Sequence, residues 1–462
     1  MKGKWLTCLK GCLSKPEDLG TGSVGLTLIR MSLPAVGMML LNTLFFMVDT
    51  IFVSWLGELS TAAVSLTFPV NMVLFSLLEG IVGGITALVG QNLGRGDSAT
   101  ARKIALSGLA LGYFLSLMMT PMLFPDISAV VINQLGASGN ADILKISYAY
   151  NMWLPLTAPL ITYMYVSNCI FRCRGDMVTP LICMAIANLV NGVLDPIFIF
   201  VLDQGVGGAA AATFVGRVFA MAWLHRKMRR SDLSIPLLPP FQSGLLKYWK
   251  PIALIGFPLT LSVGSIAFGF GVVNRILASF GHHAVAAWML SIRVEDFYFT
   301  VSMGVSSALT PFLAFNYGRR DLRRMMEGIR SAMWIAGVMM LTAGFFIFVF
   351  PHVLLGLFRP SERVMDLAVR SIRVSLLACP AVILQIMLSS AFVATGYSLF
   401  GTMAQLMRSV LGRIPTAYFF AWWLGERGIW WFQPVSWVLG AGVAWACFVH
   451  MMRKIRKDFS LP

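Results

Sequence analysis

The sequence is poor in charged residues, histidine and cysteine. Only 12% of its 462 residues are Asp, Glu, Lys or Arg, whereas about 25% is usual in a soluble chain. The five histidines and seven scattered cysteines form no metal cluster, disulfide framework or catalytic set. These shortages exclude a disordered chain, a disulfide-rich scaffold and an ordinary cytosolic enzyme.

Long apolar runs, in contrast, occupy nearly the whole chain. Hydrophobic residues make up 57% of the sequence, and the mean hydropathy is +0.77. Runs of about 18 or more apolar residues are separated by short polar or Gly/Pro-containing stretches, and each run is long enough to cross a bilayer as a helix. The sequence therefore predicts an all-α integral membrane protein.

The runs and their interruptions predict twelve transmembrane helices in two lobes of six. The helices are expected at 29–56, 61–90, 103–124, 143–171, 177–201, 206–226, 251–280, 284–314, 328–350, 367–395, 401–424 and 431–452. The predicted domains are a basic leader (1–28), a first lobe (29–226), a linker (227–250), a second lobe (251–452) and a basic tail (453–462).

Positive charge is concentrated in segments that would all lie on one side of the membrane. The formal net charge is +16, and Lys and Arg cluster in the leader, at 226–250, at 319–330 and at 453–457. Cytoplasmic loops of membrane proteins carry an excess of Lys and Arg. We therefore predict a multi-pass protein of the cytoplasmic membrane, with both termini on the cytoplasmic side. The clusters lack the aromatic residues and zinc-finger spacing of nucleic-acid-binding proteins, so no nucleic-acid partner is expected.

An internal repeat relates the two halves. Shifting the sequence by 224 residues aligns 57–97 with 281–321, where 12 of 41 positions agree, and aligns Pro34 with Pro258. Both copies end in the polar pattern Asn-x-Gly-Arg-x-Asp, which shared hydrophobicity does not explain. Six helices separate the copies, which predicts parallel repeats related by a pseudo-twofold axis along the membrane normal, a transporter architecture.

Four polar residues are predicted to meet in the outer half of the first lobe. Asp49 and Asp195 each lie eight residues from an outer turn, about 12 Å deep, and Thr213 lies at the same depth. Asn191 is one helical turn from Asp195. Ionisable groups inside a membrane are costly, so they are functional candidates, and these oxygen atoms suit Na⁺ or a shared proton. The alternative is structural: a helix cap at Asp195 and a local hydrogen bond at Asp49.

Two prolines are candidate hinges. Pro34 lies in the inner half of the first helix, and Pro196 directly follows Asp195, where it removes a helical hydrogen bond and could expose carbonyl groups. A kink that only shapes packing is the alternative.

The second lobe contains charged residues of both signs at mid-depth. They are Arg293, Glu295, Asp296 and Arg413. Opposite charges in this number indicate internal ion pairs. The cluster is interpreted either as structural or as a contact to substrate or coupling ion.

The sequence resembles the multidrug and toxic compound extrusion (MATE) family of cation-coupled antiporters, and within it the prokaryotic DNA-damage-inducible branch. The features that carry the resemblance are the two six-helix halves, Pro34, the turn at Gly90–Asp97, its copy at Asn316–Asp321 and the run Asn191–Pro196. In this resemblance, Asp49, Asn191, Asp195 and Thr213 match the family's first-lobe cation-binding positions.

The resemblance implies a secondary antiporter and not an enzyme. It would export organic cations and other amphipathic drugs or toxins by alternating access of the two lobes, in exchange for inward H⁺ or Na⁺. The expected partners are a small amphipathic substrate and membrane lipid, with no cofactor besides the coupling ion, and a monomer would suffice. The alternatives are a flippase for lipid-linked precursors, which should have a strongly cationic cavity, and a membrane-embedded transferase, for which no catalytic constellation is visible.

Overall fold

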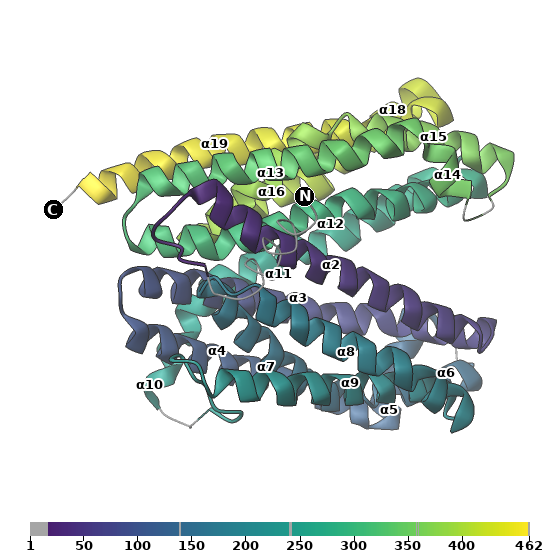
Figure 1. Ribbon diagram of the computed structural model, residues 1–462. Helices are drawn as coiled ribbons and strands as arrows, with labels where there is room; N and C mark the ends of the chain where they lie inside the picture. Colours follow the sequence, from purple (N-terminus) through teal and green to yellow (C-terminus); the bar gives the residue numbers. More distant parts are fainter. Residues whose placement is uncertain (1–16, 138–139, 240–242, 357, 359, 461–462) are drawn as a thin grey trace, which may run out of the picture. The chain divides into compact units, whose positions relative to one another are not determined.

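The computed structural model describes residues 17–137, 140–239, 243–356, 358 and 360–460. Every regular element in these segments is a helix, and they contain no strand (Figure 1). This confirms the predicted all-α class. Residues 1–16 of the predicted leader lie outside the described residues.

The first half of the chain forms six hydrophobic segments from α2 to α9. Their elements are α2 (Val24–Ser54), α3 (Glu58–Gly94), α4 (Ser98–Leu117) with η1 (Thr120–Leu123), α6 (Ala141–Asn151) with α7 (Leu154–Cys173), α8 (Val178–Pro196) with η3 (Ile197–Val201), and α9 (Gly205–Met228). Between the third and fourth segments lie α5 (Pro125–Ile132) and η2 (Asn133–Ala137).

The second half repeats this order from α11 to α19. Its elements are α11 (Trp249–Ala278), α12 (His282–Gly318), α13 (Leu322–Val349), α15 (Glu362–Leu376) with α16 (Cys379–Thr395), α17 (Ser398–Leu406) with η4 (Met407–Leu411) and α18 (Arg413–Gly428), and α19 (Phe432–Ser460). The short elements are α10 (Ser243–Leu246), α14 (Pro351–Gly356) and η5 (Ile429–Trp431).

The lengths and hydropathy of these helices are those of a multi-pass membrane protein. Among the described residues, ten helices are long and apolar enough to cross a bilayer, or eleven if α15 and α16, bent by 56°, count as one span. The remaining hydrophobic segment is the helix predicted at 401–424. Here it is divided into α17, η4 and α18. Six segments per half therefore correspond to the twelve predicted helices.

Two compact units make up the described chain. Unit 1 contains residues 17 and 37–256, and unit 2 contains residues 18–36 and 257–460. Helices α2 and α11 each contribute to both units, and the changeover in each falls within two residues of a proline, Pro34 or Pro258. Residues 29–36, which were predicted to be part of the first lobe, therefore belong to unit 2. Residues 251–256, which were predicted to be part of the second lobe, belong to unit 1.

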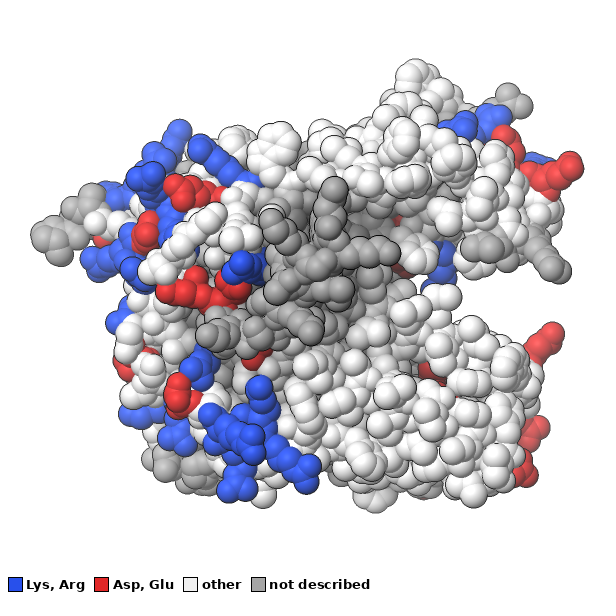
Figure 2. All heavy atoms as spheres, viewed as in Figure 1, with Lys and Arg blue, Asp and Glu red and all other residues white. Residues whose placement is uncertain are grey.

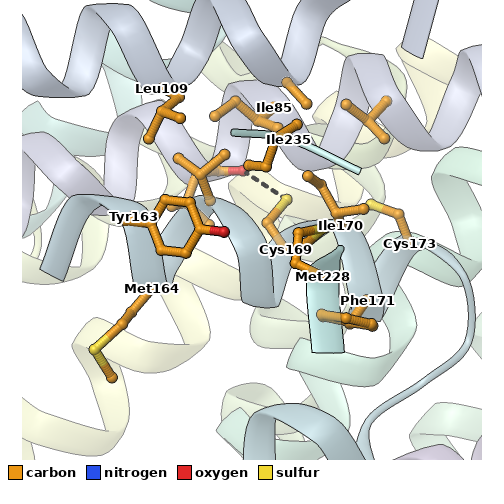
Figure 3. Close-up of a cluster of buried hydrophobic side chains, with 14 of the residues drawn as sticks. Ile85, Leu109, Tyr163, Met164, Cys169, Ile170, Phe171, Cys173, Met228 and Ile235 are labelled. Atoms are coloured by element: carbon orange, nitrogen blue, oxygen red, sulfur yellow. Dashed lines mark hydrogen bonds between the residues drawn. The ribbon is translucent and has the colours of Figure 1, made fainter. Parts of the chain in front are cut away.

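The core of unit 1 forms where α3, α4, α7 and α9 pack together. Figure 3 shows part of it, including Ile85, Leu109 and Ile170, all fully buried. The Cys169 thiol lies 3.0 Å from the Thr86 hydroxyl and also donates to the Val82 carbonyl oxygen. The buried cysteines in the described part of the chain are free thiols, and this core is built by packing rather than by covalent links.

The repeated polar pattern forms the same turn in both halves. Asp97 caps α4 by accepting a hydrogen bond from the backbone N–H of Thr100 at 2.9 Å, and Asp321 caps α13 in the same way. The turn requires a left-handed residue just before the cap, which is Gly96 (φ +80°) in one copy and Arg320 (φ +59°) in the other. Hydrogen bonds from the side chain and backbone of Thr100 lower the pKa of Asp97 below its usual value. The motif is therefore a helix-capping turn.

Lysine and arginine gather at one end of the helices in each unit (Figure 2). In unit 1 these residues surround the ends of α3, α7 and α9, and in unit 2 they surround the turn between α12 and α13 and the end of α19. This is the end that the charge pattern predicts to be cytoplasmic.

Candidate functional site

A hydrogen-bonded set joins α8 and α9 in unit 1. The Asn191 amide nitrogen donates to Asp195 Oδ1 at 2.9 Å and to Thr213 Oγ1 at 3.2 Å. Asp195 is fully buried and Asn191 is 2% exposed. Three of the four residues predicted from helix depth therefore lie in direct contact.

A glycine permits this contact. Gly216 lies on α9, one turn after Thr213, and a Cβ added to it would come within 2.7 Å of the Ala187 carbonyl oxygen and 3.3 Å of the Asn191 nitrogen. No larger residue fits without moving the two backbones apart. The sequence of α9 thus lets it approach α8 closely enough for Thr213 to reach Asn191.

Helix α8 ends next to the buried carboxylate. Pro196 is its last residue, and the π-turn η3 follows directly. Proline has no N–H, so the Gly192 carbonyl receives no hydrogen bond from position 196. Two carbonyls of the π-turn itself, those of Ile197 and Phe198, accept from loop amides at 2.9 and 3.1 Å. The predicted break at Pro196 is thus present, but its turn carbonyls are already bonded.

Asp49 reaches the same set from α2. It is half-buried and interacts electrostatically with Asp195 and with Arg217 of α9. Tyr150 of α6 also interacts electrostatically with Asp49, Asp195 and Arg217. The sequence analysis missed Arg217 and Tyr150. Arg217 was detectable, because it is an ionisable residue within an apolar helix, one turn after Thr213.

The arrangement suits a monovalent cation or a proton. Asp195 Oδ2 is buried and has no hydrogen-bond partner among the described residues. With both carboxylates ionised and Arg217 protonated, the set has a net charge of −1. The nearby donor atoms of Asp49, Asp195 and Thr213 are oxygens, as Na⁺ prefers, and the free carboxylate oxygen can equally accept a proton.

The charged residues predicted for the second lobe separate into two groups in unit 2. Glu295 is 2% exposed and Arg413 is 3% exposed, and the two interact electrostatically. Arg293 and Asp296 are exposed and interact with each other. Gln433, which the sequence analysis missed, donates from Nε2 to Glu295 Oε2 at 2.5 Å.

Comparison with known proteins gives consistent matches along most of the chain. The MatE family model matches residues 34–197 and 258–419. The "FAD transporter" of Shewanella oneidensis is 30% identical over 69% of this chain and 69% of its own length. "Multidrug export protein MepA" of Staphylococcus aureus is 26% identical over 87% of this chain and 89% of its own. An outward-facing multidrug resistance MATE family transporter of known structure matches with a TM-score of 0.88 and 26% identity, covering 96% of this chain and 100% of that one.

Proposed function

Because the chain belongs to the MATE family of membrane transporters, we propose that it is a secondary antiporter that exports organic cations and other amphipathic drugs or toxins. Inward movement of H⁺ or Na⁺ drives this export by alternating access. The multidrug export relative supports amphipathic substrates, and the FAD transporter supports extending the range to planar aromatic molecules.

The observation that supports this proposal is the hydrogen-bonded set of Asn191, Asp195 and Thr213 in unit 1, with which Asp49 interacts electrostatically. In the proposed mechanism, one cation neutralises the net negative charge of the set. Each elementary charge that moves inward supplies about 2.3 kcal/mol per 100 mV of membrane potential. The ion is H⁺ or Na⁺, and the oxygen donors fit both.

Helix α2 is the proposed link between ion binding and the conformational change. Asp49 lies about 22 Å along the helix from Pro34, and α2 passes from unit 2 to unit 1 just after Pro34. Because proline removes a hydrogen bond from the helix, bending is easiest there. Neutralising Asp49 would change the interactions of the part of α2 that lies in unit 1, while the first turns of α2 stay packed in unit 2.

The test is export of ethidium from drug-sensitive cells that express wild type or Asp49→Asn at equal levels. We expect wild type to lower ethidium retention and Asp49→Asn to leave it at the level of the empty vector, because the amide neither takes up a proton nor supplies the negative charge that attracts Na⁺. Asp142→Asn is the matched control: it makes the same change at an exposed position in the first turn of α6, and it should export as wild type does.

Each other outcome has a defined meaning. Equal export by wild type and Asp49→Asn would contradict the coupling site and leave the transporter assignment intact. Failure of wild type to export any amphipathic dye would contradict the drug substrate, and flipping of a lipid-linked precursor would then be the function to assay.

A further inference from the structure

Two arginines, one buried and one half-buried, lie at a break in the fifth hydrophobic segment of unit 2. Arg408 lies within the π-turn η4, and Arg413 is the first residue of α18. π-Turns and interrupted transmembrane helices recur at binding sites, because their irregular backbone has to line a site or be buried in protein. In unit 1 the corresponding fifth segment also has a π-turn, η3, directly after the Asp195–Pro196 pair.

The charges at this break do not balance. Arg408 and Arg413 interact electrostatically with each other, and Glu295 is the buried carboxylate that interacts with Arg413. Asp296 also interacts with Glu295 but is exposed and has Arg293 as its opposite charge. The three residues together therefore have one excess positive charge, because the buried pair Glu295 and Arg413 is balanced and the half-buried Arg408 has no carboxylate of its own. An unbalanced cation within a membrane is costly, so such a group is expected to meet an anion during function.

Donor atoms at and just before the break are also unused. The Nε atoms of Arg408 and Arg413 and the amide nitrogen of Gln405 are buried and have no hydrogen-bond partner among the described residues. The Glu295 carboxylate accepts from Gln433 through Oε2, and its other oxygen, Oε1, is likewise buried without a partner among the described residues. Buried N–H groups are normally paired, so these three donors indicate a ligand with acceptor oxygens.

Aromatic rings surround the guanidinium groups. Arg408 lies over the Trp437 ring at 3.9 Å, and Arg413 lies over the Phe270 ring at 5.0 Å. Trp437 stacks on Phe299, with ring centroids 5.2 Å apart and an angle of 27° between the planes. Arg408, Phe270 and Phe299 are only half-buried. Each therefore leaves part of its guanidinium or ring surface accessible, as binding of a flat, charged molecule requires.

We propose that unit 2 contains a binding site for the anionic group, a carboxylate or a phosphate, of a planar aromatic substrate. Arg408 and Arg413 donate hydrogen bonds to the anion, in the paired geometry that guanidinium groups favour. Phe270 and Phe299 contact the aromatic plane. This inference rests on the proposed function, because the bound molecule is the exported substrate, and it adds anionic aromatic molecules to the substrate range.

The test compares pairs of ligands that share a ring system and differ only in the anion. The phosphate pair is riboflavin 5′-phosphate and riboflavin, and the carboxylate pair is 2-naphthoate and 2-naphthamide. Binding is measured by titration calorimetry on the full-length protein in nanodiscs. We expect wild type to bind the anionic member of at least one pair about tenfold more tightly. The pair that shows the preference identifies the anion.

Arginine variants test whether the preference for the anionic ligand depends on Arg408 and Arg413. Arg408→Gln and Arg413→Gln should bind both members of the pair equally, whereas Arg408→Lys should keep part of the preference. Arg370→Gln is the control: Arg370 is an exposed residue of α15 that pairs with Asp366 at 3.0 Å, and its loss should leave the preference unchanged. If Arg413→Gln does not fold, the comparison of Arg408→Gln with Arg408→Lys suffices.

Two results would overturn the inference: equal affinity of wild type for both members of both pairs, or an undiminished preference in Arg408→Gln. Ethidium export by wild type tests the proposed transport function independently of the anion-binding measurement. Export without anion preference would refute only the unit 2 site, and anion preference without any export would refute only the transport proposal.

Discussion

At the scale of single residues, Asn191 determines which atoms of the unit 1 site stay available. Its amide donates both of its protons, one to Asp195 and one to Thr213. The amide orientation is thereby fixed, and Asp195 Oδ1 is occupied. The other carboxylate oxygen, Oδ2, has no partner among the described residues and is the atom to which we assign the proposed coupling ion.

Thr213 should therefore affect ion affinity. Thr213→Val keeps the shape of the side chain but leaves one buried Asn191 N–H without an acceptor. This loss should cost about 1–3 kcal/mol. We expect the H⁺ or Na⁺ concentration for half-maximal export from vesicles to rise roughly tenfold. Thr213→Ser retains the hydroxyl group and should stay close to wild type. An unchanged half-maximal concentration in Thr213→Val would mean that Thr213 has no part in ion binding.

Sequence reasoning predicted the contacts that depend on position along a helix. Counting from helix ends placed Asp49, Asp195 and Thr213 at one depth, and the structure shows that Asp195 and Thr213 share Asn191 as a partner. Tyr150 and Gln433 were missed because each lies near a helix end and joins its cluster only through tertiary packing. Periodicity does not reveal such contacts.

At the scale of helices, hydropathy predicted the spans but not the breaks within them. The helices predicted at 143–171 and 367–395 are each divided, and in both the second part starts with a proline in its first turn, Pro155 or Pro380. Proline is well tolerated at that position because its missing N–H would be unpaired there anyway. The π-turn η3 directly follows Pro196, which the sequence did single out, whereas η4 (Met407–Leu411) contains no proline that would mark it.

The hinge proposal leads to a prediction for α2. Pro34→Ala restores a backbone N–H and should straighten the helix at the changeover between units. We expect ethidium export to fall several-fold while binding of ethidium to the purified protein is retained. Pro69→Ala is the matched control, because Pro69 lies within α3, entirely in unit 1, and its replacement should leave export unchanged. Wild-type export by Pro34→Ala would remove the hinge from the mechanism.

At the scale of the whole molecule, the two halves share one architecture but contain sets of charged residues with opposite net charge. Each half has six hydrophobic segments, the same capped turn after its second helix and a π-turn in its fifth segment. In unit 1 two carboxylates exceed one arginine, whereas in unit 2 two arginines exceed one buried carboxylate. We infer that the duplicated fold assigns cation coupling to unit 1 and recognition of the substrate anion to unit 2.

Coupled exchange is the central claim, and reconstitution of the purified protein into liposomes tests it most directly. An H⁺ or Na⁺ gradient is imposed across the liposome membrane, and the movement of ethidium and of the ion is recorded together. We predict that the gradient drives ethidium in the opposite direction, that an ethidium gradient drives counterflow of the same ion, and that Asp49→Asn abolishes both. Ethidium movement that is indifferent to both ions, or unaccompanied by ion counterflow, would contradict antiport.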